Sequence, residues 1–496
     1  MFVAIVSLKL CPRGTGDKQS KGLDTKRMDT HMSTRKQEVS DMATQVPELE
    51  PARILEVELG QPLSAISAID EKTGRHYRRA LCLIRLHTQP LGIVEFQFDE
   101  QGVSASMCAQ HIWQRLSIEI AEHLRQDGLP LVTGLDKAGL PSATTPRCLE
   151  ERERFFAQAP FVSVIVSTRD RPEEIQTCLR SLLALHYPRY EVIVVDNAPS
   201  TSATADFIQQ TYADTPQVRY VREDRPGLSW GRNCGIRAAK GEILAFTDDD
   251  VVVDRYWLLE LVRGFGVTND VACVTGEILP LELETPAQLW FEEYEGRGNY
   301  SNRRFTRRIF DKAKRHVHLL RTGEHGGGAN MGFTAAFLRG VGGFDPALGA
   351  GRKASGDASD ILALFQAIVR GSKLVQQPTA LVYHRHRRNY TSLRKQIYHY
   401  GIGYTAYLIK SILDNPQLLL DLITKLPFDF FSILRSWSSH KRKKSIYYPK
   451  ELNWLELKGR LYGPIAYIQS WWEVHHTRYP PTNGDMRYPI FGKGKQ

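Results

Sequence analysis

The chain has 496 residues, enough for roughly two or three domains, and 42% of them are hydrophobic, which suffices for real cores. Its formal net charge of +10 suits anionic membranes, nucleic acid or phosphorylated ligands, but no zinc-finger, helix-turn-helix or RNA-binding signature is present, so no nucleic-acid partner is expected. The seven cysteines are odd in number and form no Cys-x-x-Cys pair, which indicates a reducing compartment and argues against a disulfide scaffold or a zinc site.

The N-terminal part is predicted to hold a tail and a small domain. Residues 1–52 are mostly polar and charged and are expected to be disordered. The domain, over 53–128, is of the α+β class, and its role is not evident from the sequence. Its predicted strands cover 54–59, 78–87 and 92–98, and one helix carries the apolar face Ile112, Leu116, Ile120 and Leu124. Prolines mark a linker over 129–158.

From residue 159 the chain alternates single strands and helices. The strand patterns are apolar and β-branched and lie at 161–167, 191–195, 218–221 and 243–247. Such alternation implies right-handed crossovers and a mostly parallel sheet, and ligands bind at the carboxyl ends of its strands. Thr168, Asp196 and Asp248 stand at such ends.

Three consecutive aspartates, Asp248, Asp249 and Asp250, follow the last of these strands. Carboxylates on one short turn repel each other by roughly 1 kcal/mol or more per pair, so a protein gathers them where a cation neutralises them. Alone, a run of this kind often only caps the next helix. Its place at a strand end favours a metal or a metal-bound polyphosphate.

Four segments in this order resemble the inverting family 2 glycosyltransferases, which have the GT-A fold: VSVIVSTRDRP, EVIVVDNAPS, RPGLSWGRNCGIRAAKGEILAFTDDD and GGGANMGFTAAFLRGVGGFDP. The resemblance implies a catalytic domain over 159–388 that takes a nucleotide-sugar donor and a glycan or lipid-linked acceptor. Processive members carry a Gln-x-x-Arg-Trp motif, and this chain has no Arg-Trp dipeptide. A single-sugar transferase of surface polysaccharide or glycan biosynthesis is therefore expected.

By this resemblance, Asp196 binds the nucleotide base, and Thr168, Arg169 and Asp170 line the same donor pocket. Arg232, on the helix before the aspartates, is expected to add positive charge near the diphosphate. The alternative for Arg232 is a solvated surface side chain.

The family's Asp-x-Asp motif matches Asp248 and Asp250, which are expected to hold Mn²⁺ or Mg²⁺, with Asp249 between them in the donor site. His384 belongs to a His-x-His pair with His386, and we expect His384 to complete the metal site. A histidine ligand favours Mn²⁺ over Mg²⁺. The alternative is that these histidines only pack beneath the neighbouring arginines.

The expected catalytic base is Asp360, placed by counting back from the turn that ends its helix. Ser359 stands where the family has an acidic neighbour, and Asp357 remains an alternative base under a shifted alignment. The missing acid also leaves open an inactive carbohydrate- or nucleotide-binding relative. Asn330 ends a glycine-rich segment that lacks a phosphate-loop ending and is predicted to lie on the acceptor side.

The C-terminal part, 389–496, is predicted to be helical, aromatic and basic, with a cationic run at 441–444. We find no uncharged window of 18 residues, so a membrane-spanning helix is not expected. Amphipathic helices on an anionic inner leaflet are one interpretation, and packing onto the catalytic domain is the other. The first interpretation predicts a cytoplasmic enzyme that is bound peripherally to the inner face of the cell membrane.

Overall fold

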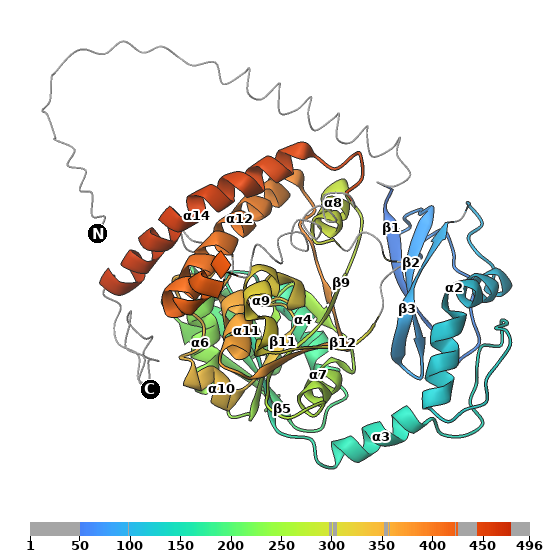
Figure 1. Ribbon diagram of the computed structural model, residues 1–496. Helices are drawn as coiled ribbons and strands as arrows, with labels where there is room; N and C mark the ends of the chain where they lie inside the picture. The colour runs from blue at the N-terminus through green and yellow to red at the C-terminus, as the bar shows by residue number, and fades with distance from the viewer. Residues whose placement is uncertain are drawn as a thin grey trace, which may run out of the picture. The chain divides into compact units, whose positions relative to one another are not determined.

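The structure is a computed structural model (Figure 1). It describes residues 50–97, 99–296, 300, 305–351, 356, 358–421, 423–424 and 444–477. All of these lie in one compact unit that begins at Glu50. The predicted tail over 1–52 falls outside the described residues except at its end, where Ala52 already opens a strand.

The small domain is α+β, as predicted (Figure 1). Its sheet has the order β1-β2-β3, with β1 parallel to β2 and β2 antiparallel to β3. The elements are β1 (Ala52–Glu58), β2 (Arg79–Leu86), β3 (Gln89–Gln97) and α2 (Ala105–Gln126). The helix buries Ile112, Leu116, Ile120 and Leu124 in one core with the sheet, because these positions recur on one helical face.

The predicted linker contains a helix that the proline pattern did not suggest, α3 (Arg147–Phe156). Its buried Arg152 donates from Nη2 to Thr88 Oγ1 at 2.6 Å, and its guanidinium lies 4.0 Å from the centre of the Tyr256 ring. Arg152 therefore connects the β2–β3 turn of the small domain to the larger domain that follows it in the chain.

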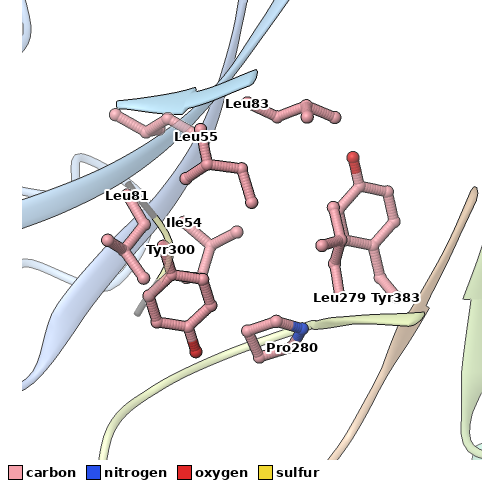
Figure 2. A pocket seen from close by; sticks show the side chains of 9 residues that line it. Ile54, Leu55, Leu81, Leu83, Leu279, Pro280, Tyr300 and Tyr383 are labelled. Atoms are coloured by element: carbon pink, nitrogen blue, oxygen red, sulfur yellow. The ribbon is translucent and has the colours of Figure 1, made fainter. Parts of the chain in front are cut away.

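Further contacts join the two domains. Arg85 Nη2 donates to Asp254 Oδ2 at 2.6 Å, and Gln89 Nε2 donates to Glu260 Oε1 at 3.2 Å. Figure 2 shows a small apolar pocket between the β1–β3 sheet and the larger domain, where Tyr383 also donates a hydrogen bond to Glu56. Its lining residues include Ile54, Leu55, Leu81, Leu83, Leu279, Pro280, Tyr300 and Tyr383.

The larger domain is built on a mixed, mostly parallel sheet, which confirms the predicted fold class. Among the described residues the strand order is β10-β12-β9-β11-β7-β4-β5-β6, with β8 paired to β12. The strands are β4 (Val162–Thr168), β5 (Tyr190–Asn197), β6 (Val218–Glu223), β7 (Ile243–Asp248), β8 (Val251–Val253), β9 (Val271–Pro280), β10 (Arg308–Phe310), β11 (Met331–Thr334) and β12 (Lys373–His384). Strands β8, β10 and β11 are antiparallel to their partners.

Helices cover both faces of this sheet, which is why its central strands are apolar at successive positions. Alternate residues of β4 divide between two cores: Val164 packs with α4 and α7, whereas Ile165 packs with α6, α10 and α11. The helices are α4 (Pro172–Leu183), α5 (Ala203–Tyr212), α6 (Leu228–Ala238), α7 (Trp257–Phe265), α8 (Pro286–Tyr294), α9 (Arg315–Arg321), α10 (Ala335–Gly340) and α11 (Ser359–Val369).

Two long helices, α12 (Tyr390–Asp414) and α14 (Lys450–His476), form the described part of the C-terminal region and run side by side (Figure 1). Glycines bring their backbones close: a Cβ at Gly401 would lie 2.2 Å from Glu456 O, and one at Gly459 would lie 2.1 Å from Tyr398 O. Thr405 Oγ1 donates to Arg460 O at 2.9 Å. Among the described residues, no helix combines the length and apolar character needed to span a bilayer.

Gly459→Ala is expected to destabilise the protein by about 1–3 kcal/mol, because the added methyl group meets the backbone oxygen of Tyr398 and must push the helices apart. Thermal unfolding of the full chain measures this effect. Gly340→Ala is the matched control, since a Cβ there meets nothing within 4 Å. Equal melting temperatures for the two variants would contradict the tight α12–α14 contact.

Candidate active site

The candidate site is assembled by strands that end in register. Thr168 at the end of β4 lies opposite Asp196 of β5, and Ser167 lies opposite Asp248 of β7. Because parallel strands in register end at the same edge of a sheet, these side chains gather at one edge. This is where the sequence predicted a ligand crevice.

Asp248, Asp250 and His384 form a cluster whose ligand-type atoms all lie within 4.8 Å of one another. The short strand β8 begins directly after the aspartates and pairs with β12, with Val251 opposite His384. This pairing places His384 Nε2 at 3.1 Å from Asp250 Oδ1, although the residues are 134 positions apart in the chain. Two carboxylates and one imidazole are a donor set that suits Mn²⁺.

The electrostatics of the cluster keep Asp250 ionised. Burial pushes the pKa of Asp250 upward, but His384 and Arg171 outweigh it and hold that pKa below its ordinary value. His386 does not join the cluster: its Nε2 lies 2.6 Å from Glu292 Oε1, and both side chains are buried. Of the two histidines, the structure brings only His384 to the aspartates.

Asp249 points to a different set of partners. Its Oδ2 accepts a hydrogen bond from Thr168 Oγ1 at 2.7 Å, and its Oδ1 accepts one from Arg171 Nη1 at 2.6 Å. Burial raises the pKa of Asp249 to about 7, against the lowering effect of Arg171. Arg171 also donates to Asp250 Oδ2 at 3.1 Å, so it links two of the three aspartates. Sequence reasoning assigned no role to Arg171, since nothing local shows that it reaches across to this turn.

Asp196 is buried, and its Oδ2 accepts a hydrogen bond from Tyr220 Oη at 3.0 Å. Its Oδ1 is buried and has no hydrogen-bond partner in the part of the chain that the structure describes. Burial is also the main cause that raises the pKa of this carboxyl group. A buried acceptor atom without a partner can accept a hydrogen bond from an N–H group of a ligand, such as that of a nucleotide base.

The other predicted donor residues lie beside Asp196. Asp170 has a positive φ of 54° and accepts a hydrogen bond from Ser200 N at 2.8 Å, so it ties the end of β4 to the loop after β5. Arg169 is exposed, and its Nε lies 3.7 Å from Asp170 Oδ2. Thr168 is turned toward Asp249. Their contact with a donor stays a prediction.

Arg232 and Asp360 meet at a glycine. Gly328 N donates to Asp360 Oδ2 at 2.6 Å, and a Cβ at Gly328 would lie 2.3 Å from Arg232 Nη2 and 3.1 Å from Asp360 Oδ2. Arg232 Nη2 is also 3.5 Å from Asp248 Oδ1. Arg232 is 2% exposed, so it is not the solvated surface arginine of the alternative interpretation. Any larger residue at position 328 would have to displace the Arg232 guanidinium.

Asp360 lies in the first turn of α11 and is 4% exposed. The alternative base, Asp357, lies outside the described residues. Asn330 is fully buried: its Oδ1 accepts from Trp257 Nε1, and its Nδ2 donates to Glu277 O and Ala380 O, each at 2.8 Å. The Asn330 amide therefore holds the glycine loop against β9 and β12, and its contact with an acceptor stays a prediction.

Two asparagines support the site and were missed from the sequence. Asn233 exchanges two hydrogen bonds of 2.8 Å with the backbone of Phe344, which fixes α6 and hence Arg232. Asn197 accepts from Gly227 N at 2.9 Å and donates to Arg225 O at 2.8 Å, which holds the turn before α6. Each asparagine directly follows a residue that the sequence assigned to donor binding, Arg232 or Asp196. That adjacency was the signal by which they could have been found.

The comparisons with known proteins agree with this geometry. Residues 163–320 match the model of glycosyl transferase family 2. Glycosyltransferase AglE of Haloferax volcanii is 36% identical over 115 residues, which are 22% of this chain and 37% of AglE. The succinoglycan biosynthesis protein ExoM of Rhizobium meliloti is 36% identical over 121 residues, which are 24% of this chain and 38% of ExoM. The matches thus span little more than a third of these relatives.

A solved mannosyltransferase of Pyrobaculum calidifontis, PcManGT in complex with GDP-Man and Mn²⁺, aligns with 66% of this chain and 93% of its own at 18% identity. Its TM-score of 0.37 is too low to carry over any feature of its site. The family assignment rests on the sequence match and on the sheet with its clustered aspartates. Residues 163–320 thus match glycosyl transferase family 2 in sequence, and they lie within the mixed, mostly parallel sheet that the sequence predicted.

Proposed function

We propose that this protein is an inverting glycosyltransferase that moves one sugar from a nucleotide-diphosphate sugar to a hydroxyl group of a glycan or lipid-linked acceptor. The observation that carries the proposal is a chain of contacts from Asp248 through Arg232 and Gly328 to Asp360. It places the Asp360 carboxylate close to the buried Arg232 and to the cluster of Asp248, Asp250 and His384. The relatives named for glycosyl transfer and succinoglycan biosynthesis support a role in surface polysaccharide or glycan assembly.

The residues present fit a divalent cation. Asp248, Asp250 and His384 would hold Mn²⁺ or Mg²⁺, since they offer two carboxylates and an imidazole within 4.8 Å of one another. When bound, the ion supplies neutralising charge for the diphosphate and stabilises it as it departs.

Three side chains of the protein have the other roles in the reaction. Asp196 Oδ1 accepts an N–H of the nucleotide base, and Arg232 places positive charge near the diphosphate. Asp360 takes the proton from the attacking acceptor hydroxyl as that oxygen bonds to the sugar carbon. Because attack comes from the face opposite the departing diphosphate, one displacement inverts the anomeric configuration.

The full chain incubated with Mn²⁺ and a panel of nucleotide sugars tests this function. We expect one donor to stabilise the protein by about 2.7 kcal/mol at a hundred times its dissociation constant, and to be consumed when a suitable acceptor is added. Nuclear magnetic resonance of the product should show the inverted anomer. A retained anomer would refute the inverting mechanism, and stabilisation without turnover on any acceptor would favour the inactive binding relative.

We also propose that the enzyme works peripherally on the anionic cytoplasmic face of the cell membrane. Helix α14 buries one face against α12, yet its opposite face is apolar and exposed. The exposed residues are Trp454, Leu457, Leu461, Ile465, Ile468 and Trp472. They recur every three or four positions, which is the pattern of a helix lying in a membrane interface. The neighbouring basic run at 441–444 lies outside the described residues except for Lys444.

Changing Trp454, Leu461 and Trp472 together to serine is expected to release the full chain from anionic vesicles. Burying one such side chain is worth about 1.5–3 kcal/mol, so the triple change should weaken binding by tenfold or more. Vesicle co-sedimentation at low salt measures it. The matched control is Ile118→Ser in the small domain, where an equally exposed apolar side chain of 77% accessibility is removed. Unchanged sedimentation of the triple variant would argue against this surface.

A further inference from the structure

A second group of metal-type ligands lies in the small domain, away from the candidate active site. His87 Nδ1, His123 Nε2, Asp127 Oδ2 and Cys148 Sγ belong to residues whose ligand atoms all lie within 4.8 Å of one another. His87 follows β2 in the turn to β3, His123 and Asp127 stand one helical turn apart at the end of α2, and Cys148 opens α3. Three separate segments of the chain thus converge on one point.

The distances within this group show that the atoms face a common centre. Asp127 Oδ2 lies 2.7 Å from His87 Nδ1, 3.1 Å from His123 Nε2 and 3.1 Å from Cys148 Sγ. The two ring nitrogens are themselves 3.1 Å apart. A tetrahedral zinc with bonds of about 2.0–2.3 Å separates its ligand atoms by roughly 3.3–3.7 Å, so the closest pair would have to move apart by about 0.6 Å and the pairs at 3.1 Å by less.

Hydrogen bonds alone do not satisfy this arrangement. The atoms His87 Nδ1, His123 Nε2 and Asp127 Oδ2 form a triangle, and with the carboxylate ionised each of them either donates or accepts. Because there are three atoms and only two roles, donor and acceptor, at least two of the atoms must have the same role. Either two N–H groups or two lone pairs therefore face each other at about 3 Å. A cation at the centre removes the conflict, because every atom then presents a lone pair to it.

The surroundings are those of a preformed site. The side chains of His87 and Asp127 are 6% and 4% exposed, and that of His123 is 10% exposed. Cys148 N donates to Asp127 Oδ1 at 2.9 Å, which orients the carboxylate from outside.

We propose that His87, His123, Asp127 and Cys148 bind one Zn²⁺ in a structural site. Nitrogen, sulfur and carboxylate ligands together suit zinc, and four protein ligands leave no position for substrate. The ion would fasten α3 to the turn after β2, next to Thr88, whose hydroxyl accepts from Arg152 of α3. The sequence argued against a zinc site because it lacks Cys-x-x-Cys spacing, but ligands drawn from three segments need no such spacing.

Metal analysis of the full chain tests this site separately from the active site. The background variant Asp250→Ala is used, so that the aspartate cluster does not contribute. We expect this protein to retain one equivalent of zinc after dialysis, and its cobalt-substituted form to show thiolate-to-cobalt absorption in the near ultraviolet. The aspartate cluster has no thiol, so that absorption cannot come from the candidate active site.

In the same background, Cys148→Ser should lose the thiolate absorption. His123→Gln should bind zinc at least about 100-fold more weakly, because even the loss of a residue that only hydrogen-bonds to a ligand lowers metal affinity by about 10–100-fold. Cys234→Ser, which removes a partly exposed thiol outside the group, should keep both properties. Circular dichroism confirms that each variant is folded. No retained zinc in the background protein, or thiolate absorption that persists in Cys148→Ser, would overturn the proposal.

Discussion

Asp360→Asn is expected to keep donor binding and to slow sugar transfer by about 10²-fold or more, the usual scale for losing a positioned general base. Asparagine retains an oxygen that can accept from Gly328 N, so the contact between α11 and the glycine loop should survive. What is lost is the carboxylate that we propose as the acceptor of the hydroxyl proton. Single-turnover transfer assays together with donor titration separate the two effects.

Asp357→Asn is the informative companion, because Asp357 is the alternative base. We expect a milder loss of transfer from this variant than from Asp360→Asn. The reverse order would move the base to Asp357 and leave Asp360 as a helix-capping residue that holds Gly328.

The second large effect is expected at the metal cluster. Asp250→Ala should abolish Mn²⁺-dependent binding of the nucleotide diphosphate, with affinity falling by at least about 10–100-fold, because it removes one of the proposed ligands and the carboxylate that His384 and Arg171 both contact. The fold should persist, since Asp250 lies at the edge of the sheet beyond β7. Isothermal titration calorimetry with and without chelator measures the loss.

Asp224→Ala is the matched control for this experiment. Asp224 is an exposed aspartate that pairs with Arg222 at 2.7 Å, outside the metal-type cluster. It should bind the nucleotide diphosphate as the parent does. Equal affinity for parent and Asp250→Ala, whether or not the metal is chelated, would remove Asp250 from the metal site.

Much of the larger domain was predictable because its signals are local. The β-branched run that became β4 and the spacing of Ile175, Leu179 and Leu182 in α4 encode a strand and a helix by periodicity alone. The run of aspartates that begins at the last residue of β7, and Asp196 near the end of β5, follow from the rule that ligands lie at strand ends. Such features depend on neighbours within a few residues, so the sequence by itself determined them.

Other features were decided only by the tertiary structure. His384 and His386 are two residues apart and look alike in the sequence, yet the pairing of β8 with β12 takes His384 to Asp250, while His386 is buried beside Glu292. The role of Gly328 was likewise visible only in the tertiary structure. Because it has no side chain, Arg232 and Asp360 can both pack against its backbone.

The zinc group of the small domain was equally hidden, since its ligands come from a turn and from two helices that are distant in the chain. These contacts join residues separated by tens to more than a hundred positions. No local pattern specifies them, because they depend on how the strands and helices pack once the whole sheet has formed.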